Sequence, residues 1–194
     1  MYLETVANQV SRLMSKERFT HCRGVTRLAG QLAAHYGADA EKAKLAGILH
    51  DCVKEFPTEE MKRWLDRAEV QDPIVLDSKK LWHAPAGAEY ARTYFRIDDE
   101  VYDAIYYHTI GKLKMPLLTK IVFLADAIEV GRDREFAWSA PARKMAFISL
   151  DSAVLSVLDQ TIVSVIKRNM MIHPNSVMVR NEILKNIQQQ KNGG

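Results

Sequence analysis

Hydrophobic residues recur every three to four positions along most of the chain, which is the spacing of an amphipathic helix. No stretch shows the strict alternation of apolar and polar residues that marks a half-buried strand. The pattern predicts helices over residues 3–14, 17–36, 40–56, 58–65, 85–95, 99–110, 117–130, 142–170 and 175–189. We therefore expect an all-α fold.

Capping residues and prolines set the expected helix boundaries. Asp39, Thr58 and Asp98 stand just before apolar helical runs, where a short polar side chain accepts hydrogen bonds from the first free N–H groups. Pro85 suits the first turn of a helix, so His83 is expected at or just before the N-terminus of that helix. The segment 142–170 is expected to form the longest helix.

The 194 residues, 47% of them apolar, suffice for one sizeable domain. We expect a single domain over residues 1–194, with a core at about 17–170, a C-terminal helix at about 175–189 and a disordered tail at 190–194. The net charge of +3 is spread along the chain without a run of Lys or Arg. This distribution favours a small anionic ligand and argues against nucleic acid as a partner.

Two cysteines, Cys22 and Cys52, are too few for a disulfide framework and are interpreted as packing residues. The first residues lack the basic start and the apolar core of a signal peptide. No apolar stretch approaches the roughly 20 residues needed to cross a bilayer. We expect a cytoplasmic protein without a membrane partner.

Six side chains that can bind metal interrupt the apolar helical pattern. The pair His50-Asp51 ends the apolar run 45–49, and a buried carboxylate without a partner is costly. A lone histidine on an apolar face is more often a satisfied core residue than a ligand, and His35 and His173 are interpreted in that way. Six such groups in one small core would be costly without a cation, so they predict a metal site: His21, His50, Asp51, His83, His108 and Asp126.

The donor set also indicates the kind of metal centre. Imidazole and carboxylate groups without a thiolate quartet suit iron, manganese, zinc or cobalt. A single ion seldom takes four histidines and two aspartates, whereas two ions that share a bridging carboxylate would use all six. Asp51 is the best candidate for the bridge, because it lies in the middle of the set. Such two-metal centres suit in-line attack at phosphorus by a metal-bound hydroxide.

The order His21, His50-Asp51, Asp126 resembles the HD-domain phosphohydrolase superfamily, and His83 and His108 resemble the extra ligands of its two-metal members. A likeness to the bacterial YqeK family of symmetrical diadenosine tetraphosphate (Ap4A) hydrolases covers about residues 20–185. It rests on five motifs: His50-Asp51-Cys52-Val53-Lys54, His83-Ala84-Pro85-Ala86-Gly87-Ala88, His108-Thr109-Ile110-Gly111, Leu124-Ala125-Asp126-Ala127-Ile128-Glu129-Val130-Gly131-Arg132 and Ile172-His173-Pro174-Asn175.

The resemblance implies an HD-type helical bundle with a buried two-metal site, iron as the favoured metal, and cleavage of Ap4A into two ADP. It implies that the six residues above are the metal ligands and that Asp51 and Lys54 are catalytic. Lys54 shares a helix face with His50 and Asp51 and is implied to contact a phosphate beside the ions, although its spacing equally fits a solvated lysine. Arg132 is implied to hold polyphosphate or adenosine.

Some alternatives stay open at this point. The ligand set fixes the reaction and not the leaving group, so another nucleotide is an alternative substrate. A non-catalytic nucleotide-binding module would be expected to lack a ligand, and none is missing. Ala84 stands where the family commonly has Gly, a change that affects the loop beside His83 and not the ligand. Arg134 and Arg143 are equally well explained as surface charges, and apolar positions on the first helix would suit a homodimer.

Overall fold

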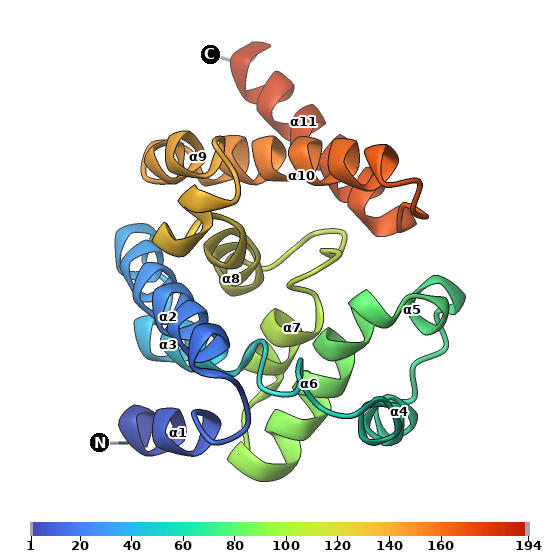
Figure 1. Ribbon diagram of the computed structural model, residues 1–194. Coiled ribbons are helices and arrows are strands. Elements are labelled where there is room, and N and C mark those ends of the chain that lie inside the picture. The colour runs from blue at the N-terminus through green and yellow to red at the C-terminus, as the bar shows by residue number, and fades with distance from the viewer. Residues whose placement is uncertain (1, 193–194) are drawn as a thin grey trace.

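The computed structural model describes residues 2–192, which contain eleven α-helices, one 3-10 helix and no strand (Figure 1). The all-α prediction is therefore confirmed for this part of the chain. The elements are α1 (Tyr2–Val10), α2 (Lys16–Tyr36), α3 (Ala40–Leu49), α4 (Thr58–Arg67), α5 (Pro73–Asp77), α6 (Lys79–Phe95), α7 (Asp99–Tyr106), α8 (Leu117–Ile128), η1 (Val130–Arg134), α9 (Ser139–Ala146), α10 (Leu150–Lys167) and α11 (Pro174–Asn192).

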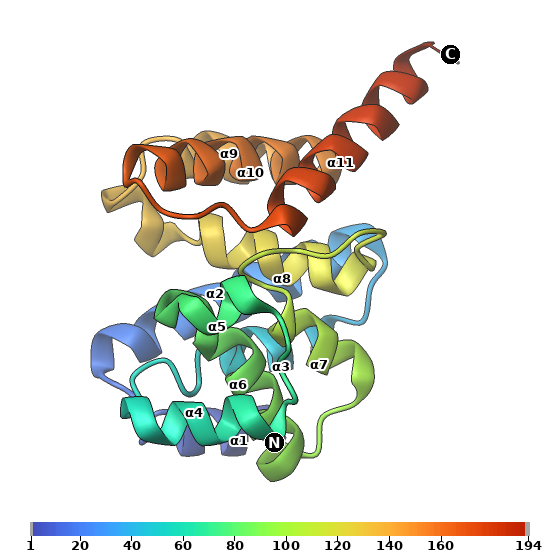
Figure 2. The same ribbon diagram turned by 90° about the vertical axis from the view of Figure 1, so that its right-hand side faces the viewer.

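Helix α8 lies at the centre of the arrangement. Figures 1 and 2 show α9, α10 and α11 on one side of α8, and α2, α3 and α7 on the other. Its residues are buried around most of its circumference, including Ile121, Val122 and Leu124, because it has neighbours on both sides. Asp126 therefore projects from a helix that is fixed by packing. The expectation that residues 1–194 form one domain stays a prediction.

Helix α2 forms the long wall beside α3 and α8. Its N-cap is Ser15, whose side chain accepts a hydrogen bond from the N–H of Arg18, and its C-cap is Gly37, which adopts the left-handed conformation with φ 71°. Asp39 caps α3 and Asp98 caps α7 through their side-chain oxygens, as predicted. Thr58 was predicted as a cap, but it is the first residue of α4 and follows Pro57.

The structure corrects three predictions in the C-terminal part. The single helix expected over 142–170 is divided into α9 and α10, because Ser149 accepts a hydrogen bond from the N–H of Ser152 and starts a new helix. Helix α11 continues through residue 192, so residues 190–192 of the tail predicted to be disordered are helical. Residues 193–194 of that prediction lie outside the described residues. Residues 131–134, which lie between the helices predicted over 117–130 and 142–170, form a 3-10 helix together with Val130.

Most of the apolar surface of helix α1 is used within the chain, and a homodimer through this helix stays a prediction. Its apolar residues Val6, Ala7 and Val10 are buried against the core, and the helix contacts α3. The amphipathic pattern of α1 thus marks packing within the chain. Within residues 2–192 no helix is long and apolar enough to cross a membrane.

Candidate metal centre

The six predicted ligands lie together although they come from five parts of the chain. His21 belongs to α2, His50 and Asp51 follow α3, His83 belongs to α6, His108 follows α7 and Asp126 belongs to α8. Ligand atoms of His21, His50 and Asp126 lie within 4.8 Å of one another, and so do those of His50, Asp51 and His108. His83 adjoins the second group, with its Nε2 3.1 Å from His108 Nε2.

His50, Asp51 and His108 were predicted to lie within helices, but the structure places them in turns just beyond the helix ends. Helix α3 ends at Leu49, and tighter turns hold His50 and Asp51, with hydrogen bonds such as Cys52 N–H to Leu49 O. Apolar spacing cannot distinguish such turns from a helix, because both return to the same face after about three residues. His108 lies two residues beyond the end of α7, in a turn that closes at Gly111 with φ 71°.

His83 lies inside α6 and not before its N-terminus, because the helix begins at Lys79 and continues through Pro85. Trp82 Nε1 donates a hydrogen bond to the Leu76 carbonyl and is buried, which ties this first part of α6 to α5. The residues around Pro85 are buried, and the free energy gained by burying them offsets the cost of the helical hydrogen bond that a proline cannot make.

Asp51 lies between two sets of histidines, and each of its oxygens faces one set. Its Oδ2 is 3.5 Å from His50 Nε2 and 4.0 Å from His21 Nε2. Its Oδ1 is 3.3 Å from His83 Nε2 and 3.7 Å from His108 Nε2. Its side chain is fully buried, so both oxygens are directed to protein groups and not to solvent. A carboxylate placed in this way can bind one cation with each oxygen.

Two of the histidines are oriented by backbone carbonyls on the side away from the centre. His50 Nδ1 lies 2.9 Å from the Gly47 oxygen, and His108 Nδ1 lies 2.7 Å from the Ile105 oxygen. Only a protonated Nδ1 can donate to a carbonyl, so in the neutral ring the Nε2 lone pair is directed to the centre. The Nε2 of His50 is buried and makes no hydrogen bond to the described residues. This unpartnered atom fits a metal ligand better than a core histidine.

Glu129 orients a third histidine and is a functional residue that the sequence analysis missed. Its Oε1 lies 3.1 Å from His21 Nδ1, while His21 Nε2 faces Asp126 Oδ1 at 2.9 Å. Its Oε2 accepts a hydrogen bond from the N–H of Gly131. Glu129 stands three residues after Asp126, so the helical spacing of the two carboxylates was the signal that could have revealed it.

Glu129 needs a glycine opposite it on α2. A Cβ built on Gly24 would lie 2.9 Å from Glu129 Cδ and closer still to its Oε2, a contact that real Cβ atoms do not make. Glu129 is only 5% exposed, and its carboxylate accepts a hydrogen bond from the N–H of Gly131. The carboxylate therefore has little freedom to move away. Gly24 is thus required for the contact between Glu129 and His21.

Glu129→Ala should weaken metal binding about 10- to 100-fold, because His21 would lose the acceptor that fixes its ring and its tautomer. Glu129→Gln keeps an acceptor oxygen, so its metal affinity should fall less than that of Glu129→Ala. Gly24→Ala should resemble Glu129→Ala, since it displaces the same carboxylate. Competition with a chelating dye measures the metal affinity of each variant. The exposed Glu59→Ala serves as the control, and unchanged affinity in Glu129→Ala would contradict this role.

Charges around the centre shift the ionisation of its residues strongly. Burial lowers the pKa of His50, but the carboxylates of Asp51 and Asp126 outweigh burial and raise it to about 9. Burial raises the pKa of Asp51, yet His50 and Lys54 hold it well below its usual value. The pKa of Asp126 is likewise held low against burial by the neighbouring side chains of His21 and His50, with the charge of Arg132 acting in the same direction. The two carboxylates are therefore anionic and attract cations.

Three protein cations lie against these carboxylates. Lys54 Nζ is 3.2 Å from both Asp51 Oδ1 and His83 Nε2. Arg132 Nη2 is 2.8 Å from Asp126 Oδ1. Arg18, which the sequence analysis did not single out, places Nη1 2.9 Å from Asp51 Oδ2. It precedes His21 by three residues on α2, a spacing that could have revealed it.

The start of α11 supports the turn that carries His108. Asn175 Nδ2 donates to the Gly111 oxygen at 3.3 Å, and Ser176 Oγ donates to the Ile110 oxygen at 3.4 Å. His173 is buried and paired with Asp72, 2.9 Å from its Oδ2, in agreement with its interpretation as a satisfied core histidine. The motif 172–175 thus acts through packing and not at the centre.

The two cysteines agree with their interpretation as packing residues. Cys22 and Cys52 are free, fully buried thiols, and neither belongs to a candidate metal group within residues 2–192. Burial raises the pKa of both thiols, which disfavours the thiolate that a metal would require. The donors available at the centre are therefore imidazole and carboxylate, which fit divalent cations of the borderline or hard class.

The chain is similar to several known proteins. The HD domain family matches residues 18–131. The chain is 35% identical to the symmetrical bis(5'-nucleosyl)-tetraphosphatase of Bacillus subtilis, over 89% of this chain and 92% of that protein. It is 39% identical to the protein of the same name from Halalkalibacterium halodurans, over 88% of this chain and 91% of that protein. A crystal structure of a predicted HD superfamily hydrolase involved in NAD metabolism from Clostridium acetobutylicum is 33% identical, with a TM-score of 0.88 over 94% of this chain and 97% of that one.

Proposed function

This chain belongs to the HD-domain family, and on that premise we propose that it is a symmetrical bis(5'-nucleosyl)-tetraphosphatase. It hydrolyses diadenosine tetraphosphate into two ADP. The relatives that carry this name match nearly the whole chain and not only its HD domain. The observation that carries the proposal is the position of Asp51, whose two oxygens face two separate sets of histidines.

The six clustered residues are proposed to hold two divalent cations, with Asp51 as the bridge. The pairs of distances from Asp51 to its neighbours support a bridge, and the unpartnered Nε2 of His50 supports a ligand role. His21 and Asp126 would serve the ion on the Oδ2 side, and His83 and His108 the ion on the Oδ1 side. We propose iron as the metal, with manganese, cobalt and zinc as the other ions that this donor set accepts.

Cations held there would supply positive charge to the phosphates and a water activated for attack on phosphorus. The protein itself contributes Lys54, whose ammonium stands beside Asp51 and His83 and can donate to a phosphate oxygen as negative charge develops. Arg132 stands beside Asp126 and lines the open side of the centre, where its guanidinium can bind the polyphosphate. Arg18, next to the other oxygen of Asp51, can act in the same way.

Symmetrical cleavage requires that water attacks one of the two inner phosphorus atoms and that the P–O bond towards the other inner phosphate breaks. One ADP then carries the oxygen from water, and the other ADP leaves. Lys54, Arg18 and Arg132 are three cations around one small volume, which suits a chain of four phosphates better than a single phosphate ester.

Incubation of the purified, metal-analysed protein with Ap4A should give ADP as the sole product on anion-exchange chromatography. The protein should contain about two metal ions per chain, as the two-metal site requires. Release of AMP and ATP would show asymmetric cleavage and contradict the proposal. No turnover of Ap4A together with rapid hydrolysis of a nucleoside monophosphate would transfer the function to another nucleotide.

A further inference from the structure

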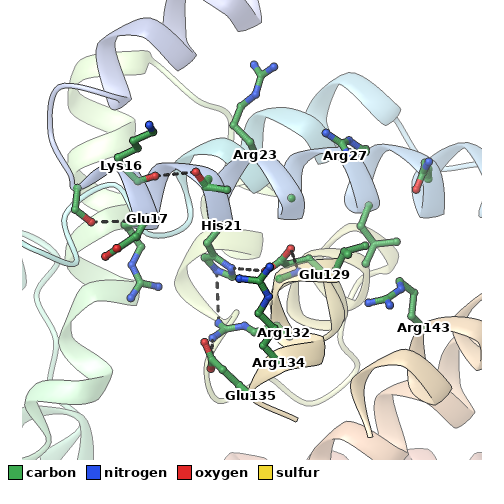
Figure 3. Close-up of a pocket in the computed structure, with 18 of the residues that line it drawn as sticks. Lys16, Glu17, His21, Arg23, Arg27, Glu129, Arg132, Arg134, Glu135 and Arg143 are labelled. Carbon is green, nitrogen blue, oxygen red and sulfur yellow. Dashed lines mark hydrogen bonds and ion pairs between the residues drawn. The ribbon is translucent and has the colours of Figure 1, made fainter. Parts of the chain in front are cut away.

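A cavity of about 910 Å³ opens beside the metal centre, between α2 and the segment around η1. His21, Glu129 and Arg132 belong to its wall, so the cavity is continuous with the His21 side of the centre. Figure 3 shows Lys16, His21, Arg23 and Arg27 along α2, with Arg132 and Arg134 on the other side. The volume is in the range of small-molecule sites, which leaves room for a ligand that extends from the centre.

The wall of this cavity is strongly basic. Seven basic residues line it against four glutamates: Lys16, Arg18, Arg23, Arg27, Arg132, Arg134 and Arg143. Several of these cations already have acidic partners, such as Arg143 with Asp133 and Arg23 with Glu4. The excess of positive charge favours a ligand with several negative charges.

Two of the arginines differ from the others. The side chains of Arg27 and Arg134 make no hydrogen bond or ion pair with the residues that the structure describes, although both line the cavity. Arg27 lies six residues beyond His21 on α2, about 9 Å further along the helix axis. Arg134 lies two residues beyond Arg132, on the opposite wall. The two free guanidinium groups thus stand on both sides of the space that leads away from the centre.

We propose that this cavity holds one nucleoside diphosphate half of the substrate, with Arg27 and Arg134 as its phosphate-binding residues. The proposal rests on the function given above, because cleavage between the inner phosphates leaves a diphosphate on each side of the broken bond. One such half has to extend away from the metals, and the cavity begins at His21 and Arg132. Val130, 67% exposed on the same wall, offers an apolar surface to the base.

The test uses the full-length, metal-loaded protein with Arg27→Gln, Arg134→Gln and the double variant. Each single substitution should raise the Kd for ADP in calorimetric titration, and the KM for Ap4A, about tenfold. The effect should fall on KM more than on kcat, because the two arginines lie away from the reacting phosphorus. Arg63→Gln on α4 is the matched control, since it removes the same charge from an exposed residue outside the cavity.

Each outcome separates this inference from the proposed function. If the wild-type protein cleaves Ap4A but the variants keep its KM and its Kd for ADP, the cavity assignment is overturned and the function stands. If the wild-type protein binds ADP in a manner that needs both arginines but does not cleave Ap4A, the function fails and the assignment stands. If Arg63→Gln raised the Kd for ADP and the KM for Ap4A as much as the cavity variants do, the effect would come from net charge and the assignment would be overturned.

Discussion

Replacement of Asp51 by Ala is expected to remove both metal ions and to abolish hydrolysis of Ap4A. Among the described residues, Asp51 is the carboxylate whose two oxygens face both sets of histidines, at 3.5 Å from His50 and 3.3 Å from His83. Without it, neither ion has its shared anionic ligand. We expect the rate to fall at least about 1,000-fold, which corresponds to about 4 kcal/mol of transition-state stabilisation. Metal analysis and product chromatography on the same preparation measure both effects.

A second variant separates the bridge from a simple loss of charge. Asp51→Asn keeps the size of the side chain but offers a single carbonyl oxygen, so it can contact one ion and cannot bridge two. We expect at most about one ion per chain in this variant. The exposed Asp66→Asn is the matched control and should keep both ions and the full rate. A fully active Asp51→Ala protein with two ions would contradict the assignment of the centre.

Removal of the metal should abolish activity and lower the melting temperature markedly. The donors come from α2, α6, α8 and the turns after α3 and α7, so bound ions join elements that are distant in sequence. A ligand at about a thousand times its Kd stabilises the folded state by about 4 kcal/mol. For a chain of this size that corresponds to a fall of roughly 8–16 °C when the ions are removed.

The measurement is a thermal scan before and after dialysis against a chelator, followed by separate addition of Fe²⁺, Mn²⁺, Co²⁺ and Zn²⁺ without oxygen. The ion that restores both the melting temperature and the cleavage of Ap4A identifies a competent metal. The Asp51→Ala protein is the control, because its melting temperature should not respond to chelator or to metal. Full activity and an unchanged melting temperature after chelation would contradict a metal-dependent hydrolase.

Helix boundaries show where reasoning from the sequence succeeded and where it failed. Asp39 and Asp98 were predicted correctly as caps, because capping depends on the residue and its immediate neighbours. The division of the segment 142–170 at Ser149 and the turns at His50 and Asp51 were missed. Apolar spacing of three to four residues is the same for a helix, a tight turn and a helix that restarts, so the pattern could not distinguish them.

The candidate site shows a similar division. The sequence predicted the six clustered residues, because unpaired polar groups are too costly to bury singly in an apolar pattern. Lys54 and Arg132 beside them were implied by the family resemblance. Arg18 and Glu129 were missed, since an Arg or a Glu near a helix end is usually a surface charge. Only the packing of α2 against the segment after α8, which Gly24 makes possible, shows that Glu129 orients His21.

The sequence by itself determined the all-α class, the identity of the candidate ligands and, through its resemblance to a known family, the reaction to test. These follow from residue types and local spacing, which the chain carries wherever it folds. The tertiary structure decided which oxygen of Asp51 faces which histidines, and which arginines remain unpaired in the cavity. Such facts depend on distances between residues as far apart as Arg27 and Arg134, which are set by how the helices pack and not by any local pattern.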